Sequence, residues 1–416
     1  MPIESKLLMR QQNSLSHRII TVDALRGFAL LGILLAHMIF WYTAGPLPGD
    51  IFNKYHDIGT GIISILNELL ISGKFFAFFS FLFGLSFFLQ MQSMERRNDN
   101  FVVLYAWRIA LLGIIGLIHH AFWRGDILSI YAPLGFLLLP MRKMTNRAIL
   151  IIGILFAINA PGKVIEVIKF LTTNPHTTAV ASKPVDFDAE GKAYYHIISQ
   201  ANLPALLKDN SNNLSTKFRF QLDSGRIFIT FGFFLLGMYT GRKRWFETPE
   251  ESRLVIKKIC RKSGWFILLT LAIGLGIFGA NGLFKLGWEQ NPIVGFIFSI
   301  FYDIHSAALV CFYVSGLTLV MYRERWQKVL YPLASVGKLA LTCYLSQTLL
   351  GLALFYHVGF GLVAQTPPWL NWLIGIAYFF LQVAVSKWWL TLFNYGPVEW
   401  LWRSATFFRW FPFKKK

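Results

Sequence analysis

Residues 25–40 read LRGFALLGILLAHMIF, a nearly unbroken apolar run close to the length of one membrane span. Two further runs repeat this pattern, ILIIGILFAI at 149–158 and WLIGIAYFFLQVAV at 372–385. A transmembrane β-barrel would instead show segments of about 10 residues with alternating polarity. Because a helix satisfies its backbone hydrogen bonds within itself, these runs predict helices that cross a lipid bilayer. We therefore expect an all-α fold, a polytopic transmembrane helix bundle.

The composition also favours a membrane protein. Of the 416 residues, 55% are hydrophobic and only 15% are charged, whereas about 25% is usual in soluble domains. The formal net charge of +19 would suit a nucleic-acid-binding protein, but the basic residues stand in short clusters between apolar runs. We therefore exclude nucleic acid and expect the lipid bilayer as a partner. The three Cys residues have no metal-ligand spacing, and no metal site is predicted.

The apolar runs predict about ten spans, with boundaries good to a few residues. They lie at residues 25–43, 75–91, 104–122, 126–141, 147–170, 226–241, 263–280, 294–321, 330–357 and 371–393. The long polar stretch at 171–225 separates five spans from five. We therefore divide the chain into an N-terminal half (1–170), an external polar loop (171–225) and a C-terminal half (226–416). The basic segment 242–262 is the largest predicted cytoplasmic loop.

Basic residues gather on one side of the predicted bundle. The short external turns hold only Lys54, Lys74, Arg124 and Lys285. The cytoplasmic ends carry Arg10, Arg18, Arg96, Arg97, Arg142, Lys143, Arg147, Arg242, Lys243, Arg244, Arg323, Arg325, Lys414, Lys415 and Lys416. An excess of Lys and Arg in cytoplasmic loops is the rule for membrane proteins, so both termini are predicted to be cytoplasmic.

One segment, residues 55–73, fits neither a span nor a loop. It is apolar enough to be helical, yet it carries His56, Asp57, Asn67 and Glu68. We interpret it as an external amphipathic or partly inserted helix. The pattern leaves open whether it spans the bilayer or lies at its surface.

The densest group of polar residues joins the third and fourth spans and reads HHAFWRGDILSIY at 119–131. A His beside a carboxylate is a candidate general base, so His119 and Asp126 are candidate catalytic residues. Arg124 and Asp126 are also predicted to form an ion pair. The alternative is a hairpin locked by that ion pair, with no chemistry. The candidate binding residues here are His120, Trp123, Arg124 and Tyr131.

The first span carries three polar residues. Asp23 and Arg26 are three residues apart, a spacing that favours an ion pair on one helix face. His37 lies eleven residues beyond Arg26 and almost on the same face, near the external side. His37 is a third candidate catalytic residue, and Asp23 and Arg26 are candidate binding residues. The alternative for His37 is a hydrogen bond to a neighbouring helix.

The later spans supply three further binding candidates. Asp303 and His305 interrupt the eighth span and should point in different directions. Gln347 ends the segment GKLALTCYLSQ at 337–347, whose polar stripe is typical of hydrogen bonding between helices. Near the C-terminus, GPVEWLWR at 396–403 predicts an interfacial helix.

Five segments together resemble a bacterial integral membrane family, domain of unknown function 418, which includes YeiB-like proteins. They are DALRGFALLGI at 23–33, FSFLFG at 79–84, GDILSIY at 125–131, GKLALTCYLSQ at 337–347 and GPVEWLWR at 396–403. They occur in the family's order along nearly the whole chain. The resemblance implies a multi-pass protein of the bacterial cytoplasmic (inner) membrane.

That family is distantly similar to transmembrane acyltransferases that modify carbohydrates at the outer face. The shared feature is an Asp-x-x-Arg-Gly opening followed by an apolar helix that ends in His, here Asp23, Arg26 and His37. The likeness implies an acyl donor bound from the cytoplasm, such as acyl-coenzyme A, and a glycan or small-molecule acceptor. His37 or His119 would deprotonate the acceptor, and Arg26 would hold donor phosphates.

Two other interpretations stay open. A transporter of a small solute would use Asp303, His305 and Asp126 as proton or substrate sites. A structural or regulatory envelope protein would need no turnover. The sequence contains no P-loop, dinucleotide-binding, zinc-protease or Gly-x-Ser-x-Gly motif, so enzymes and pumps built on those motifs are not expected.

Overall fold

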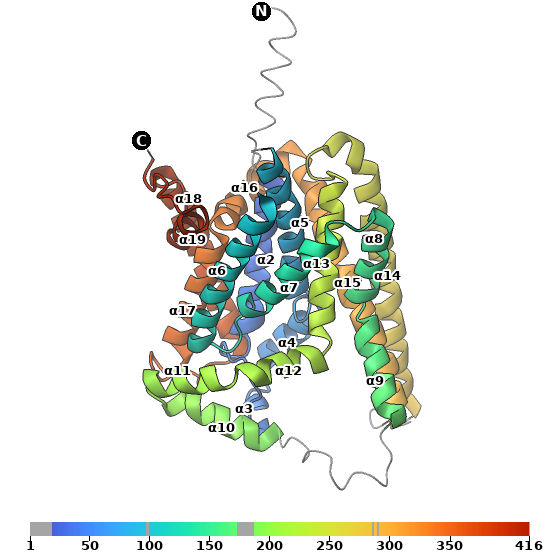
Figure 1. The fold of residues 1–416 in the computed structure, drawn as a ribbon. Coiled ribbons are helices and arrows are strands. Elements are labelled where there is room, and N and C mark those ends of the chain that lie inside the picture. Colours follow the sequence, from blue (N-terminus) through green and yellow to red (C-terminus); the bar gives the residue numbers. More distant parts are fainter. Residues whose placement is uncertain (1–18, 97–99, 173–186, 285–286, 289–290, 416) are drawn as a thin grey trace, which may run out of the picture.

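The computed structural model describes residues 19–96, 100–172, 187–284, 287–288 and 291–415. Over these ranges the chain is helical, and an isolated bridge between Phe393 and Lys414 is its only β pairing. The predicted all-α helix bundle is confirmed (Figure 1). Arg10, Arg18, Arg97, Lys285 and Lys416, assigned above to one side or the other, lie outside the described residues.

Five helices form the centre of the bundle. They are α2 (Ile20–Met38), α5 (Phe75–Glu95), α6 (Phe101–Phe122), α7 (Leu128–Met141) and α13 (Arg226–Arg242). α13 packs along α5, α5 along α2, and α6 along α7. α2 is the most enclosed of the long apolar helices, with 61% of its apolar window buried. The helix with the Asp-x-x-Arg-Gly opening is therefore the core of the fold.

Eight further helices surround this centre in the part of the chain that the structure describes. On one side stand α8 (Asn146–Ala157), α9 (Ala160–Thr172), α14 (Pro249–Phe284) and α15 (Pro292–Met321). On the other stand α16 (Glu324–Lys338), α17 (Ala340–Phe355), α18 (Pro368–Leu392) and α19 (Pro397–Phe407). Only 6% of the apolar window of α14 is buried, and Trp265 and Leu275 are among its exposed side chains. Apolar side chains that face outward in this way are suited to lipid.

Helices outside the apolar spans cover one end of the bundle. They are α10 (Phe187–Gln200), α11 (Leu203–Asn212) and α12 (Leu214–Asp223), and they lie across the lower end in Figure 1. We call these three helices the cap. α2 begins at the opposite end of the bundle, where α19 also lies, and it ends beside the cap (Figure 1). The stretch predicted as an external polar loop, 171–225, is thus largely helical, since residues 187–223 are almost all in α10 to α12.

The segment 55–73, predicted as an external amphipathic or partly inserted helix, is largely helical too. It contains α4 (Ile58–Leu70), preceded by the short α3 (Gly49–Phe52). Asp57 caps α4 by accepting hydrogen bonds from the backbone and hydroxyl of Thr60, at 3.0 and 2.7 Å. Thr60 and Asn67 are buried while Ile58 and Ile65 are exposed. This inverted pattern, with polar residues inside and apolar residues outside, fits a helix in contact with lipid.

Every predicted span corresponds to a helix or to a bent pair of helices. Six helices are long and apolar enough to cross a membrane, α4 and α5 being taken together, and eight qualify if each bent pair is one span. α7 and α13 have 14 and 17 residues, and these are shorter than a usual span. The polytopic membrane protein is therefore supported, and the number of ten spans stays a prediction.

Several predicted boundaries were wrong. The first helix runs over Ile20–Met38 and not 25–43, because Trp41 and Tyr42 adopt positive φ and end it in a turn. The spans predicted at 147–170 and 330–357 are each broken, with bends of 53° and 80°. The basic loop predicted at 242–262 is in large part the start of α14, which begins at Pro249.

Candidate functional site

His119 lies in the last turn of α6, and both of its ring nitrogens are hydrogen-bonded. Nδ1 lies 2.8 Å from Oδ1 of Asp126, and Nε2 lies 2.9 Å from the hydroxyl oxygen of Thr348 in α17. All three side chains are buried. Together with Lys217 of the cap they form what we call the histidine cluster. A hydroxyl, an imidazole and a carboxylate in this order are the groups that nucleophilic and general-base catalysis use.

The Asp126 carboxylate lies in the tight turn between α6 and α7. The backbone amides of Leu128 and Ser129 donate to its two oxygens at 3.0 and 2.8 Å. Burial alone would raise the pKa of Asp126, but the hydrogen bond from His119 and the charge of Lys217 hold it well below its usual range. The ionised carboxylate accepts a hydrogen bond from the Nδ1–H of His119, so Nε2 is the basic atom of the neutral ring.

Lys217 brings a positive charge from α12 into the histidine cluster. Its Nζ is 3.3 Å from Oδ2 of Asp126, 2.8 Å from the hydroxyl of Ser129 and 3.3 Å from Nδ1 of His120. Burial lowers the pKa of Lys217, and the Asp126 carboxylate offsets part of that effect. The candidate binding residue His120 is therefore in contact with the cluster through Lys217.

The other candidate base, His37, converges with His119 on one indole ring. The ring centroids of His37 and Trp123 are 4.7 Å apart at 90°, and those of His119 and Trp123 are 5.8 Å apart. Trp123 is itself fixed by a 2.8 Å hydrogen bond from its Nε1 to the carbonyl of Tyr42. Spacing along the chain could not place His37 near His119, and the fold brings them together.

The predicted ion pair between Arg124 and Asp126 was wrong. Arg124 instead pairs with Asp209 of α11, donates to Asn210 at 3.2 Å and stacks on the ring of Tyr194 of α10. Neighbouring charges on one turn point apart here, because Asp126 turns inward to His119 while Arg124 turns toward the cap. Arg124 thus fastens the cap to the bundle.

A cavity of about 230 Å³ lies within the bundle among α2, α5, α6, α7, α16, α17 and α19. We call it the central cavity. Phe79 and Gln90 of α5 both line it, so it extends about 16 Å along that helix. Between those two positions its wall is largely apolar and includes Phe83, Phe87 and Leu112, with Ser86 as a polar member near the Gln90 end. The central cavity is therefore long and narrow, with different chemistry at its two ends.

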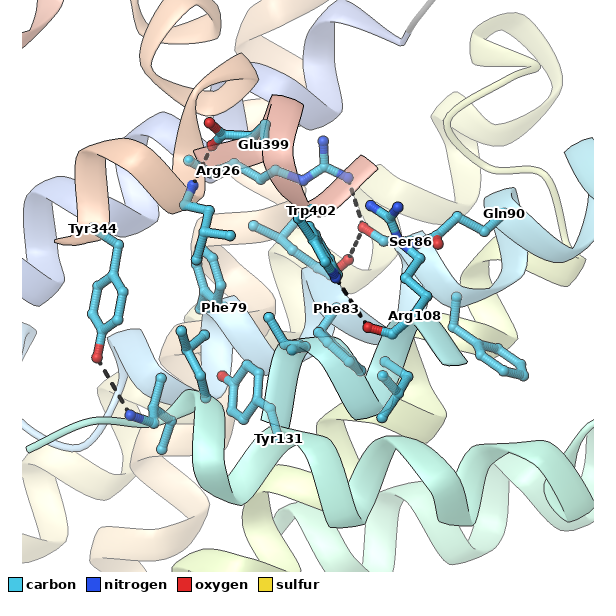
Figure 2. Close-up of a pocket in the computed structure, with 18 of the residues that line it drawn as sticks. Arg26, Phe79, Phe83, Ser86, Gln90, Arg108, Tyr131, Tyr344, Glu399 and Trp402 are labelled. Carbon is cyan, nitrogen blue, oxygen red and sulfur yellow. Dashed lines mark hydrogen bonds between the residues drawn. The ribbon is translucent and has the colours of Figure 1, made fainter. Parts of the chain in front are cut away.

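Basic residues line the end nearer the start of α2. Figure 2 shows Arg26, Ser86, Arg108 and Glu399 gathered there, and Lys338 also lines it. The Arg26 guanidinium donates to Asp23 at 2.7 Å, as its spacing predicted, and to Ser86 at 2.6 Å. Its side chain is 21% exposed, so this end is accessible.

The opposite end of the central cavity closes on the histidine cluster. Ile127, Leu128, Tyr131 and Tyr344 line it, and the hydroxyl of Tyr344 accepts from the amide of Ile127 at 3.3 Å (Figure 2). The ring of Tyr344 meets that of His119 edge-on, at 5.1 Å between centroids. The candidate binding residue Tyr131 thus faces the cavity, and the Tyr344 ring lies between the cavity and His119.

Asp303 and His305 lie elsewhere in the fold and point apart, as predicted. Asp303 accepts from Asn159 at 3.1 Å, lies 3.6 Å from Nζ of Lys163, and lines a second cavity of about 90 Å³ with Arg226. His305 is 2.8 Å from the hydroxyl of Thr270 in α14. The structure does not bring either residue to the histidine cluster.

The polar stripe of α17 joins helices, as its pattern predicted. Gln347 donates to Gln382 of α18 at 3.0 Å, and Gln382 donates to the hydroxyl of Ser346 at 2.8 Å. Glu399 of the C-terminal segment accepts from the amides of Leu341 and Thr342 at 2.7 and 3.0 Å, which fixes the first turn of α17. α17 is therefore held at its start and along one face.

Sequence reasoning missed Lys217 and Thr348. Lys217 stands in a stretch that looked like a polar loop, and nothing in its spacing links it to Asp126. Thr348 follows Gln347 directly and shares a helix face with Leu341 and Tyr344, at the i, i+3, i+7 spacing. That spacing was the one signal in the sequence that pointed to Thr348.

Comparison with known proteins decides the family. A family model described as "Protein of unknown function (DUF418)" matches residues 240–409. The uncharacterized protein YxaH of Bacillus subtilis (strain 168) is 30% identical over 420 residues, covering 96% of this chain and 97% of YxaH. The chain belongs to the DUF418 family. The resemblance inferred from the five sequence segments is thereby confirmed.

Other DUF418 relatives match over a similar length. An uncharacterized 39.9 kDa protein in the amylase 3' region of Bacillus acidopullulyticus is 26% identical, covering 96% of each chain. The uncharacterized protein YeiB of Escherichia coli (strain K12) is 24% identical, covering 94% of this chain and 96% of YeiB. The similarity therefore includes the cap and the histidine cluster as well as the segment that the DUF418 model matches.

Proposed function

We propose that this protein is a transmembrane acyltransferase. It takes an acyl group from a donor at the Arg26 end of the central cavity and passes it to a hydroxyl or amine acceptor at the His119 end. The observation that carries this proposal is the path of the central cavity, which leads from basic side chains through an apolar channel to the ring that contacts His119.

The Arg26 end suits a phosphate-bearing donor such as acyl-coenzyme A. Arg26, Arg108 and Lys338 line this end, and Arg in particular binds phosphate oxygens in a planar, two-pronged geometry. Beyond them the Phe83 and Leu112 wall leads toward the His119 end and offers a narrow channel for the arm of the donor that carries the thioester. The two halves of the cavity therefore match the two halves of such a donor.

The His119 end supplies a general base. Asp126 orients the imidazole and leaves Nε2, which faces the Thr348 hydroxyl, as the atom that takes a proton from an attacking group. His37 contacts the ring of Trp123, as His119 does, and is the second candidate base. It is positioned for an acceptor that enters beside the cap. Arg26 and His37, on one helix, would thus serve donor and acceptor respectively.

The orientation proposed for the protein follows its charges. The Arg26 end faces the cytoplasm, where acyl-coenzyme A is found, and the cap faces outward from the bacterial inner membrane. Both termini are then cytoplasmic, and the acceptor is an envelope glycan or small molecule. The division into two five-span halves around the cap is part of the same proposal.

Donor binding is the first test. Acetyl-coenzyme A and longer acyl-coenzyme A species should raise the melting temperature of the detergent-purified protein in a saturable way, because they bind the folded state. Arg108→Ala should remove most of that shift. Lys258→Ala, which removes an exposed charge on α14 outside the cavity, should not. A monodisperse sample that responds to none of these donors would contradict the proposal.

Product formation is the second test. His119→Ala and His37→Ala should each lower transfer of labelled acyl groups to envelope extracts, by about 10²- to 10⁴-fold for the general base. Mass spectrometry of the acylated product measures this, and the melting temperature shows that each variant is folded. Retention of full transfer by both variants would exclude these two residues as bases.

A transporter is the second candidate, favoured by the smaller cavity that contains Asp303 and Arg226. Its weakness is that Asp303 is already bonded by Asn159 and Lys163, as expected of a polar anchor between helices. Flux of a solute into vesicles that is abolished by Asp303→Asn, in a protein that binds no acyl donor, would favour transport.

A further inference from the structure

The geometry points to Thr348 as a nucleophile that carries the acyl group covalently between donor and acceptor. This inference rests on the proposed acyl transfer and divides it into two half-reactions, both at the His119 end of the cavity. Its basis is the arrangement of Thr348, His119 and Asp126, which has the order and spacing of a nucleophile, a base and an orienting carboxylate.

The two hydrogen bonds set the direction of proton transfer. Asp126 also accepts from two backbone amides and lies beside Lys217, so it stays an acceptor toward Nδ1 of His119. Nε2 of the neutral ring is then an acceptor, and the hydroxyl of Thr348 donates to it across 2.9 Å. This is the contact through which a base activates a hydroxyl nucleophile.

Thr348 also differs from several other hydroxyl residues in the apolar helices. Ser80, Ser86 and Thr318 each donate to the carbonyl four residues earlier in their own helix, at 2.6 to 2.7 Å. Such back-bonding is the usual way for a helical hydroxyl to be satisfied in an apolar environment. Among the described residues Thr348 makes no such bond, and its hydroxyl is directed at His119 instead.

The central cavity leads toward this hydroxyl. Leu341 and Tyr344 of α17 line the cavity, and Thr348 is the next residue on the same helix face, about 6 Å beyond Tyr344. Thr348 is only 1% exposed, so an ester formed there would be shielded from hydrolysis by water. The Tyr344 ring, which lies between the cavity and His119, must move aside for a donor carbonyl to reach Thr348.

The chemistry of the two half-reactions balances. First, the hydroxyl oxygen of Thr348 attacks the thioester carbonyl of the donor while its proton passes to Nε2 of His119. The C–S bond breaks, the proton leaves with sulfur as a free thiol, and Thr348 holds an ester. Then the acceptor hydroxyl attacks this ester and gives its proton to Nε2. The C–O bond to Thr348 breaks, and the proton returns to the Thr348 oxygen.

The test is to trap the ester. The purified protein is incubated with acetyl-coenzyme A without acceptor, and its intact mass and peptide map are measured after denaturation. One acetyl group is expected on Thr348. Thr348→Ser should keep the adduct. Thr348→Val, which is close to Thr in shape, should not form the adduct, and its transfer rate should be lower by at least about a hundredfold. The melting temperature of both variants shows whether they are folded.

A second probe separates this inference from the proposed function. A small fluorophosphonate modifies activated hydroxyls and needs no acyl donor, and labelling of Thr348 that is lost in His119→Ala supports the nucleophile even if the donor assignment fails. Transfer of acetyl groups by wild type and by Thr348→Val at equal rates, without an adduct, would overturn the inference and leave the proposed acyltransferase standing. Absence of both the ester and the fluorophosphonate label on Thr348 would overturn it as well.

Discussion

The carboxylate of Asp126 shows how much one residue can organise. It accepts hydrogen bonds from the imidazole of His119 and from two backbone amides of its own turn, and it forms an ion pair with the ammonium of Lys217. The hydrogen bonds fix the entry of the chain into α7, and the ion pair attaches the cap to the bundle. Removing one partner from a buried pair leaves the other charge uncompensated, which is costlier than the pair is stabilising. Asp126 therefore has a structural role beside its proposed catalytic one.

We predict a specific pH profile for this residue. The pKa of Asp126 is lower in the folded than in the unfolded protein, so its stabilisation is complete above the unfolded value of about 4 and is lost only as the pH falls below it. Asp126→Asn should lower the free energy of unfolding by about 3 kcal/mol. The difference in melting temperature between wild type and variant should be constant from about pH 8 to 5 and shrink only in stronger acid.

Melting curves in detergent over this pH range measure the profile. Asp223→Asn, an exposed carboxylate at the end of α12, is the matched control and should change little. A difference that already disappears between about pH 6 and 5, above the pKa of an ordinary Asp, would show that ionisation of Asp126 does not set the stabilisation.

Helices α5 and α13 cross at a distance that only glycine permits. A Cβ on Gly237 would lie 2.0 Å from the carbonyl oxygen of Phe81, and one on Gly84 would lie 1.9 Å from that of Phe234. The two contacts are reciprocal, so each helix presents a glycine to the backbone of the other. Small residues at such crossings are how membrane helices gain close packing where lipid offers no hydrophobic driving force.

Gly237→Ala should therefore destabilise the fold, by about 1–3 kcal/mol, although alanine is the better helix former. Gly274→Ala in α14 is the matched control, because nothing lies within 4 Å of its added methyl group. It should be neutral or slightly stabilising. Thermal unfolding of both variants in the same detergent makes the comparison. Equal stability of the two variants would mean that α5 and α13 are further apart than described.

At the scale of elements, the sequence predicted which segments are helical better than where they bend. Apolar runs are visible in the sequence, and every one of them is a helix or a bent pair. The breaks follow tertiary contacts, as at Asn159, which has φ of 59° and bonds to Asp303 across the bundle. The same limit applies to the site. His119 and Asp126 are seven residues apart and were predicted together, whereas Lys217 and Thr348 reach them from distant helices.

The whole molecule is asymmetric along the axis of its bundle. One end holds the start of α2, α19 and the basic residues of the central cavity, and the other holds the cap and both candidate bases. Because the two ends of the central cavity are lined by different side chains, its proposed use requires a defined orientation of the protein in the membrane. The composition supports a membrane protein, but the proposed orientation rests on the distribution of Lys and Arg.

Labelling with a membrane-impermeant maleimide in intact cells decides that orientation. Ser211→Cys places a thiol on an exposed position of α11 in the cap, and Arg325→Cys places one at the exposed start of α16. In both variants Cys260 and Cys311 are replaced by Ser, so that they do not react with the maleimide. Cys343 is kept because it is buried. We expect Ser211→Cys to react in intact cells and Arg325→Cys to react only after permeabilisation. The reverse result would place the Arg26 end of the cavity outside the cell, away from cytoplasmic acyl-coenzyme A. Because the direction of transfer follows from that placement, the proposed donor would then have to be abandoned even if the histidine cluster proved essential.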